Sequence, residues 1–501
     1  MSWLQNDLSQ TLQRTPERLD QLSSLIDPQW ITQVLSTTGK ASIRRRKLPA
    51  EHVIWLVIGL ALFRNQPIWD VARQLQLTLH NQPLSVPSAA VAGRQRLGEE
   101  PLAHLFRLLC QGWTACECVC QRVLGLRLLA VDGVVWATPD TPDNRLALGS
   151  SSNQHGSGGW PQIRAVCLMD TYSHELLDAR MGAMSQGELT LAADLQNIDQ
   201  SLTVFDRAYF SAAFLLNWQS QGQDRHWLMR AKDNLRHEVI VQHDEHDCLV
   251  SMPVSPTARK IDPQLPSHWQ ARLIEVQLGG RKRRFITSLT DASRYPAKEL
   301  AKLYMQRWEI ELGFREIKHS LQSSQWTLRS KQPQLVRQEL WGVLIAYTLL
   351  RRLMRQMAAH VKVEPLRMGF HVASMAMTDM LRFAPVESAG TLPNRLQLLR
   401  RSNLTAQTGL HISSRPVSAA CTSSLVTGLS APNKGRYDAL LLGSCAERGP
   451  DGTNVSSDRE AIWGTISQRF NSVTRWQLVS RRQRLAPGLG AARPTRPKPS
   501  R

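Results

Sequence analysis

Three acidic residues, far apart in the chain, have the type and setting needed to hold metal ions. Asp132 lies inside the apolar run LLAVDGVVW, Asp206 follows the apolar run LTVF, and Glu311 lies in the charged segment YMQRWEIELGFREIK. A carboxylate inside an apolar run is costly to bury unless a partner or a metal ion compensates its charge. Two Mg²⁺ ions that catalyse phosphoryl transfer need hard oxygen ligands of this kind. The three residues therefore predict such a site, and the alternative is that backbone or arginine contacts satisfy a buried Asp132.

The segment around Glu311 is expected to form one helix, from about Pro296 to Leu321. Ile310, Phe314 and Ile317 share one arc of this helix, which is predicted to face the core. A second arc of about 100° suits either solvent or phosphate, and it holds aromatic and charged residues: Tyr304, Arg307, Trp308, Glu311, Arg315 and Lys318. Of these, Trp308 is predicted to lie at the edge of the core rather than to stack on a base.

The elements that would position these residues can be read from the middle of the chain. Short runs of branched and apolar residues, which are typical of buried strands, begin near residue 123. In chain order the pattern predicts strands at LRLLAVDGVVW, IRAVCLMD and ELLDARMG, a helix at GELTLAADLQ, a strand at LTVF, a helix at SAAFLLNWQSQ and a strand at HWLMRA. This is the order of an RNase H-like mixed sheet. In such a sheet, the strand that carries Asp132 and the strand that precedes Asp206 are neighbours. The predicted fold class is therefore α/β.

Three domains are expected. Composition and periodicity predict a helical amino-terminal DNA-binding domain at residues 1–122 and an RNase H-like domain at residues 123–403, with a β-rich insertion at about 233–290. An irregular basic tail is predicted at residues 404–501. Gly279 and Gly280 mark the turn of a hairpin in the insertion. A basic cluster, Arg44, Arg45 and Arg46, precedes the helical periodicity, and it suits either DNA or an ordinary solvated loop.

The composition points to a polyanionic partner. The chain of 501 residues carries a net charge of +20 and contains 42% hydrophobic residues, which excludes a disordered protein and favours a globular one that binds nucleic acid. The longest apolar run, VIWLVIGLALF, is too short to span a bilayer, and the first residues lack the pattern of a signal peptide. We therefore expect a cytoplasmic protein without a membrane partner.

The sequence resembles the insertion-sequence-4 family of bacterial DDE transposases over roughly residues 25 to 400. The family signature Y-(2)-R-(3)-E-(6)-K occurs at Tyr304, Arg307, Glu311 and Lys318. The contexts VDGVVW and FDRAYFS resemble those of the first two family aspartates, and RRRKLPAEHVIWLVIGLALFR resembles the amino-terminal domain. The segment after residue 404 does not align with the family pattern.

The resemblance implies a DNA transposase whose DDE triad is Asp132, Asp206 and Glu311. It implies that Tyr304, Arg307 and Lys318 contact DNA near the cleaved phosphate. Further candidate DNA contacts are the arginine on the same helical arc and the basic cluster, namely Arg315, Arg44, Arg45 and Arg46.

The implied activity is cut-and-paste transposition. The protein would bind the terminal inverted repeats of its insertion sequence as a homodimer, cleave with two Mg²⁺ ions, for which Mn²⁺ can substitute, and join the ends to target DNA. In the family the second strand is cut through a hairpin intermediate. The implied location is the bacterial cytoplasm, in association with the nucleoid.

Two other functions fit the same residues. A catalytically idle DNA-binding protein derived from a transposase would bind element ends without metal-dependent cleavage. Another RNase H-like nuclease, such as a repair or junction-resolving enzyme, would cut structured DNA and give no joined product.

Overall fold

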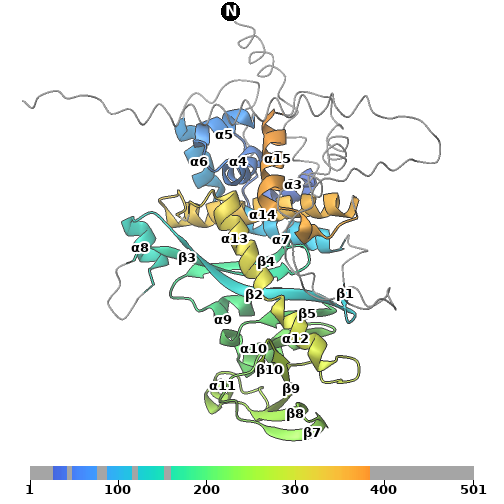
Figure 1. Cartoon of the computed structure of the whole chain (residues 1–501). Coiled ribbons are helices and arrows are strands. Elements are labelled where there is room, and N and C mark those ends of the chain that lie inside the picture. The colour runs from blue at the N-terminus through green and yellow to red at the C-terminus, as the bar shows by residue number, and fades with distance from the viewer. Residues whose placement is uncertain are drawn as a thin grey trace, which may run out of the picture. The chain divides into compact units, whose positions relative to one another are not determined.

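The computed structural model describes residues 26–41, 48–75, 87–115, 122–151, 159–325, 327–360 and 362–383, which all belong to one compact unit, Met1–Val426 (Figure 1). The basic cluster at residues 44–46 and the tail at residues 404–501 lie outside the described residues. The three-domain division stays a prediction.

The described strands form one mixed sheet of ten strands, and its first half has the predicted RNase H-like order. The neighbours run β4-β3-β2-β5-β6. The bounds are β2 (Leu126–Ala137), β3 (Gln162–Asp170), β4 (Leu176–Ala183), β5 (Ser201–Phe205) and β6 (Arg225–Arg230), with β1 (Arg122–Val123) paired to the start of β2. Strands β2, β5 and β6 are parallel, whereas β3 and β4 run antiparallel to their neighbours.

Short helices connect these strands and cover the sheet. They are α8 (Pro142–Leu148), α9 (Glu188–Ala193) and α10 (Ala212–Ser220). Strands β2 to β6, α9 and α10 follow the predicted sequence of three strands, helix, strand, helix and strand. Because both faces of the central strands are covered, their apolar runs are buried, and Leu129, Val131 and Val204 have no or almost no exposed surface.

The β-rich segment predicted as an insertion continues the sheet instead of forming a separate layer. Strand β10 pairs with β6, and the order then runs β10-β9-β8-β7. The bounds are β7 (Glu238–Asp244), β8 (Asp247–Pro253), α11 (Pro256–Ile261), β9 (His268–Leu278) and β10 (Arg281–Thr287). The predicted hairpin is confirmed: Gly279 and Gly280 have φ of 58° and 75° between β9 and β10, a conformation that glycine adopts without strain.

Helices pack together at the other end of this unit (Figure 1). They are α3 (Pro28–Thr37), α4 (Ala50–Leu62), α5 (Ile68–Gln74), α6 (Pro87–Leu97), α7 (Glu100–Ala115), α14 (Pro333–His360), η4 (Pro365–Arg367) and α15 (Phe370–Phe383). Helix α4 is buried from Val53 to Leu62, and α14 packs against both α4 and α7. None of the described helices is long and apolar enough to cross a membrane.

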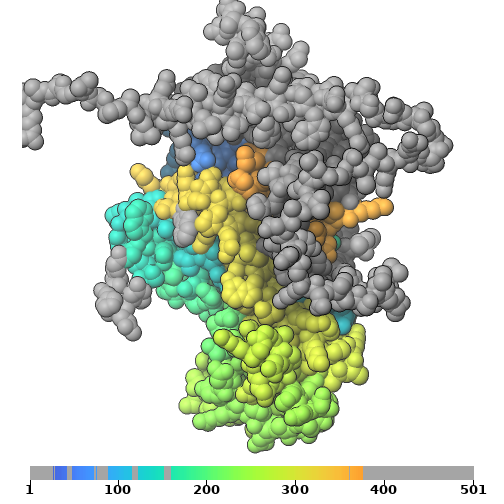
Figure 2. Space-filling model, viewed as in Figure 1, coloured from blue at the N-terminus to red at the C-terminus, as the bar shows by residue number. Residues whose placement is uncertain are grey.

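The predicted single helix from Pro296 to Leu321 is wrong in one respect, because the chain bends near its middle. Helix α12 (Ala297–Met305) ends before α13 (Trp308–Arg315), and α13 continues as a π-helical segment, η3 (Glu316–Leu321). At the bend, the N–H groups of Gln306, Arg307 and Glu309 donate to carbonyls three residues earlier, which tightens the turn. These three elements, in yellow, form part of the outer face between the strands in cyan and the green β-rich end (Figure 2).

The apolar arc predicted for this segment is confirmed. Ile310 and Ile317 are fully buried, and Phe314 is 6% exposed. Gly313 lies on the same side of α13, where a Cβ atom would come within 2.3 Å of the Cε atom of Met169 on β3. The absence of a side chain at this position lets α13 pack close to the sheet.

Candidate active site

Asp132 and Asp206 lie on neighbouring strands because β2 pairs in parallel with β5. The last paired positions are Val131 and Phe205, so the two aspartates are the next residues on the two strands. Asp132 remains within β2, whereas Asp206 caps the short 3₁₀ turn η2 (Arg207–Tyr209). The register therefore places Asp132, within β2, beside Asp206, just past the end of β5.

Helix α13 packs on β2 and carries Glu311 toward Asp132, and Arg307 lies between the two carboxylates. Nη2 of Arg307 is 2.9 Å from Oε1 of Glu311, and its Nη1 is 3.7 Å from Oδ2 of Asp132. The side chains of Arg307, Asp132 and Glu311 are 10%, 19% and 37% exposed, so the pair with Asp132 is better shielded from water than the pair with Glu311. The structure thus brings the first and third predicted carboxylates to one guanidinium group.

Burial dominates the electrostatics of Asp132. It raises the pKa of this carboxyl from 3.8 to about 6, although the N–H of Gly133 donates to it at 2.8 Å and Arg307 is nearby. The negative charges of Glu311 and Glu188 contribute to this rise. A carboxylate in this position gains from any cation that can replace its proton.

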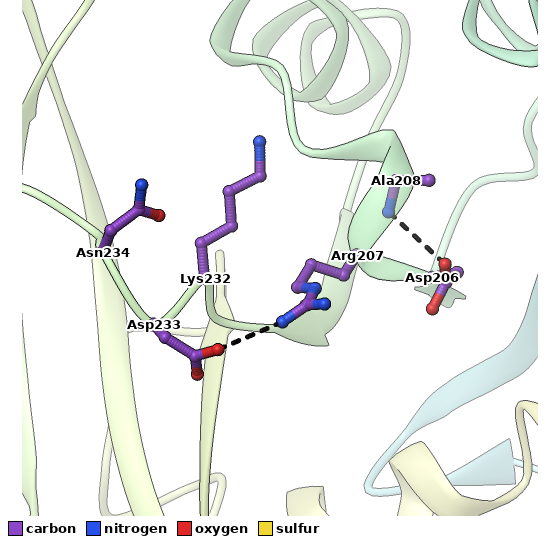
Figure 3. A pocket seen from close by; sticks show the side chains of 6 residues that line it. All are labelled: Asp206, Arg207, Ala208, Lys232, Asp233 and Asn234. Carbon is purple, nitrogen blue, oxygen red and sulfur yellow. Dashed lines mark hydrogen bonds and ion pairs between the residues drawn. The ribbon is translucent and has the colours of Figure 1, made fainter.

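A pocket of about 570 Å³ opens beside Asp206 (Figure 3). Its lining carries acidic, basic and amide groups: Asp206, Arg207, Ala208, Lys232, Asp233 and Asn234. Nη1 of Arg207 is 3.3 Å from Oδ2 of Asp233, and both of these side chains are exposed. Lys232 extends away from that ion pair, and its Nζ lies 5.0 Å from the centre of the Phe210 ring. The Asp206 carboxylate therefore shares this pocket with a lysine and an arginine.

Lys318 lies in the π-helical segment and reaches the strand that carries Asp132. Its Nζ donates to the carbonyl oxygen of Val135 at 2.9 Å and lies 5.5 Å from the centre of the Trp136 ring. Burial lowers the pKa of Lys318. The ammonium group is thus held against β2, three to four residues beyond Asp132.

The other predicted contact residues differ in exposure. Tyr304 is 5% exposed, its ring lies 5.1 Å from that of Phe285, and burial raises its pKa. Arg315 is exposed. Trp308 is 52% exposed, so the prediction that it lies at the edge of the core is wrong; it lies on the polar side of α13, where the Arg307 guanidinium covers its ring at 4.8 Å.

Sequence reasoning missed one carboxylate near the site, that of Glu188. It lies in the first turn of α9 and folds over β2, where a Cβ atom on Gly133 would be only 2.5 Å from its Cδ. Arg164 of β3 pairs with it at 3.6 Å. Its place at the start of the helix after the third RNase H-like strand is the one signal that could have identified it.

The donor set suits a hard divalent cation. Asp132, Asp206 and Glu311 offer only carboxylate oxygens, and Asp132 is a buried acid whose proton a cation can displace. Among the described residues, no group of three or more histidines, cysteines, aspartates or glutamates is already gathered as a metal site. The Arg307 guanidinium occupies the positive position between Asp132 and Glu311.

Two protein-family models match the chain. The model described as "Insertion element 4 transposase N-terminal" matches residues 16–107, and the model described as "Transposase DDE domain" matches residues 124–349. Together they cover α3 to α6, the RNase H-like strands β2 to β6, the β-rich extension and α13, which carries Glu311.

Curated relatives match over much of their length. The chain is 39% identical over 383 residues to the transposase InsG for insertion sequence element IS4 of Escherichia coli (strain K12), which covers 76% of this chain and 86% of that protein. It is 36% identical over 218 residues to the putative transposase InsZ of the same organism, covering 42% of this chain and 71% of the relative.

A solved structure of the piggyBac transposase synaptic complex with hairpin DNA overlaps 79% of this chain and 86% of its own, at 10% identity and a TM-score of 0.37. A likeness at this level adds no argument to the strand order and register described above.

Proposed function

Because the chain belongs to the insertion-sequence-4 family of DDE transposases, and is therefore a DNA transposase, we propose that it binds the terminal inverted repeats of its own element and moves it by cut-and-paste. The observation that carries this proposal is the meeting of Asp132 and Glu311 at Arg307, next to the strand end that bears Asp206. Family membership implies the use of a divalent metal ion, and Mg²⁺, with Mn²⁺ as a substitute, is the ion we propose.

Asp132, Asp206 and Glu311 are the proposed metal ligands and catalytic residues. When bound, two divalent cations lower the pKa of water and stabilise the attacking and leaving oxygens of a phosphodiester. The strands hold two of the carboxylates on rigid backbone, and α13 adds the third from above the sheet. This arrangement would orient the attack, first of water on the element end and then of the freed 3′-hydroxyl on target DNA.

Arg307 is proposed to exchange partners when the site fills. In the described structure its guanidinium pairs with Glu311 and Asp132, which leaves less negative charge unpaired in a partly buried site. Cations held by the carboxylates would take over that role. The guanidinium could then pair with a phosphate oxygen of the DNA end, for which its fork of donors is well suited.

The remaining DNA contacts are proposed from position and charge. Lys318 beside β2 and Tyr304 beside Arg307 lie next to the carboxylates, and Arg315 adds an exposed cation on the same helix. Lys232 borders the pocket at Asp206, where a neighbouring phosphate of the strand could lie. The cluster at residues 44–46 is a proposed contact outside the described residues.

Assembly and location are also part of the proposal. We expect a homodimer on paired element ends, acting on double-stranded DNA and without a membrane partner. The relatives are bacterial proteins, and a cytoplasmic, nucleoid-associated location is expected for an enzyme that acts on the chromosome.

A strand-transfer assay tests the function. The protein is incubated with Mg²⁺, a labelled duplex that carries the ends flanking its gene, and a supercoiled target plasmid. The expected result is cleavage at the element end followed by joining of the label to the plasmid. Cleavage without a joined product would favour an RNase H-like nuclease, and specific binding without either product would favour an idle DNA-binding protein.

The same reactions test the hairpin step. On a denaturing gel, a hairpin at the element end migrates as a product of about twice the strand length that is resistant to strand separation. A gel with nicked ends and joined product but no such band would overturn that step while leaving the transposase activity in place.

A further inference from the structure

The face of α13 opposite Glu311 ends in a buried polar cluster, which the proposed chemistry does not use. Glu309 and Glu316 are seven residues apart and share one side of the helix, whereas Glu311 is roughly 200° away from Glu309 around the axis. The side chains of Glu309 and Glu316 are only 20% and 18% exposed. Both of them point toward the turn between β3 and β4.

His174 in that turn contacts both glutamates. Its Nε2 is 2.8 Å from Oε2 of Glu309, and its Nδ1 is 3.3 Å from Oε2 of Glu316. The side chain of His174 has no exposed surface, and its backbone has a φ of 61°. A left-handed conformation in a residue other than glycine persists only where the surrounding contacts fix it.

Helix α14 completes the cluster from the other side. Tyr347 donates its hydroxyl to Oε2 of Glu316 at 2.9 Å, and Nε of Arg351 donates to the same oxygen at 3.0 Å. Nη2 of Arg351 lies 3.1 Å from Nδ1 of His174, and the arginine is 1% exposed. His174, Glu316 and Arg351 are thus each held by at least two other members, and the cluster joins α13, α14 and the β3–β4 turn.

Close packing leaves α13 little freedom to shift along this face. A Cβ atom on Gly313 would lie 3.0 Å from the Tyr347 hydroxyl and 2.3 Å from Cε of Met169. The contacts of Glu309 and Glu316 lie about one turn on either side of this close approach. Together they constrain both the rotation of α13 about its axis and its position along that axis.

We propose that His174 is a positioning residue for catalysis: its Nε2 contact with Glu309, together with the contacts of Tyr347 and Arg351 to Glu316, fixes the rotation of α13, and so sets the direction in which Glu311 faces the two aspartates. The side-chain contacts of His174 go to Glu309, Glu316 and Arg351, and not to the proposed metal ligands. A small rotation of α13 would displace the Glu311 carboxylate from the sheet edge, and misplacement of about 1 Å can lower turnover by about 10²-fold.

Two substitutions separate the two contacts of the imidazole. His174→Gln places an amide where Nε2 lies and can keep the bond to Glu309, whereas His174→Asn places an amide only where Nδ1 lies. Asparagine tolerates the left-handed backbone better than glutamine does. His174→Asn, which we expect to be the less active variant, therefore has the less strained backbone. A loss of activity in the asparagine variant alone cannot therefore come from backbone strain.

The inference rests on the proposed function, and strand cleavage is measured with full-length protein at saturating and limiting DNA. We expect His174→Asn to lower kcat by about 10- to 100-fold with little change in KM, and His174→Gln to recover most of that loss. Hydrogen exchange of peptides covering residues 308–321 should be faster in the asparagine variant than in the glutamine variant.

Arg94→Met is the matched control, because Arg94 is a buried cation that bonds to Gln338 and Ser330, away from α13. It should lower the melting temperature without changing kcat per folded molecule. Equal kcat in the parent and both His174 variants would overturn the inference, and so would equal losses in both variants with unchanged exchange over residues 308–321. An inactive parent protein would instead contradict the proposed function.

Discussion

At the scale of single residues, the site is built around charges that are expensive to bury. Asp132 is mostly buried between a backbone N–H and the Arg307 guanidinium, and its pKa of about 6 records the unfavourable free energy of its charged form. A protein keeps such a group where its charge is needed, because a buried acid without a task is easily replaced by a neutral residue.

This cost can be measured as a dependence of stability on pH in metal-free protein. A carboxyl whose folded pKa is raised from 3.8 to about 6 contributes to stability below pH 4, and the contribution is lost as the pH rises through 6. Asp132→Asn removes the charge, so we expect the variant to be more stable than the parent by about 2 to 3 kcal/mol at pH 7.5 and nearly equal at pH 4. Chemical denaturation in EDTA at the two pH values measures this difference.

Divalent metal ions supply the complementary control. A cation that binds the folded parent should raise its free energy of unfolding, whereas Asp132→Asn should respond much less. A variant whose advantage over the parent is the same at pH 4 and pH 7.5 would show that Asp132 does not carry the raised pKa.

At the scale of elements, glycines set how closely the helices approach. A Cβ atom on Gly342 of α14 would lie 2.7 Å from Cγ1 and 2.9 Å from the carbonyl oxygen of Val57 on α4. Backbone cannot move aside as a flexible side chain can. We expect Gly342→Ala to lower the free energy of unfolding by about 2 kcal/mol, because overpacking outweighs the roughly 1 kcal/mol that alanine adds to a helix.

Gly369→Ala is the control for this prediction, since a Cβ atom there would have no neighbour within 4 Å. Urea denaturation should show little change for it. If Gly342→Ala were as stable as the parent, α4 and α14 would have to be farther apart than the structure places them.

The sequence predicted where the helices and strands lie better than it predicted where a helix is interrupted. Branched apolar runs identified β2 to β6, and Gly279-Gly280 identified the β9–β10 hairpin, because both signals are local. The bend at Gln306 and Arg307 depends on backbone hydrogen bonds that no residue type predicts, so one long helix was expected. Trp308 was assigned to the edge of the core from its aromatic side chain, and its exposure shows that residue type alone does not determine burial.

The predictability of the site follows the same division. The spacing of Arg307 and Glu311 within one helical turn predicted their shared face, and the paired strands placed Asp132 beside the end of β5. Sequence reasoning missed Glu188 and His174, because the approach of Glu188 to Gly133 and the contact of His174 with Glu309 each join residues more than fifty positions apart. Only the folded chain brings these groups together.

At the scale of the whole molecule, charge should govern how the protein meets DNA. The net charge of +20 is far from what folding alone requires, and an exposed cation such as Arg315 lies beside the site. For duplex DNA, the logarithm of affinity falls with the logarithm of salt concentration with a slope of about −0.9 for each phosphate neutralised.

Arg315→Ala should reduce the magnitude of this slope by about one and weaken binding to element ends and to unrelated duplex by the same factor. Fluorescence anisotropy over a series of salt concentrations measures both quantities, with the unrelated duplex as the internal control. An unchanged slope would remove Arg315 from the DNA interface.

The central claim is that Asp132, Asp206 and Glu311 form one metal-dependent catalytic site, and one comparison tests it most directly. Cleavage of a labelled element end in Mg²⁺ is measured for the parent, for Glu311→Gln and for Glu299→Gln, a matched change of carboxylate to amide on the preceding helix, together with binding to the same duplex. We expect Glu311→Gln to lose at least about 10³-fold in cleavage with binding retained, since several kcal/mol of transition-state stabilisation are removed. Glu299→Gln should cleave like the parent, and equal cleavage by Glu311→Gln and the parent would contradict the claim.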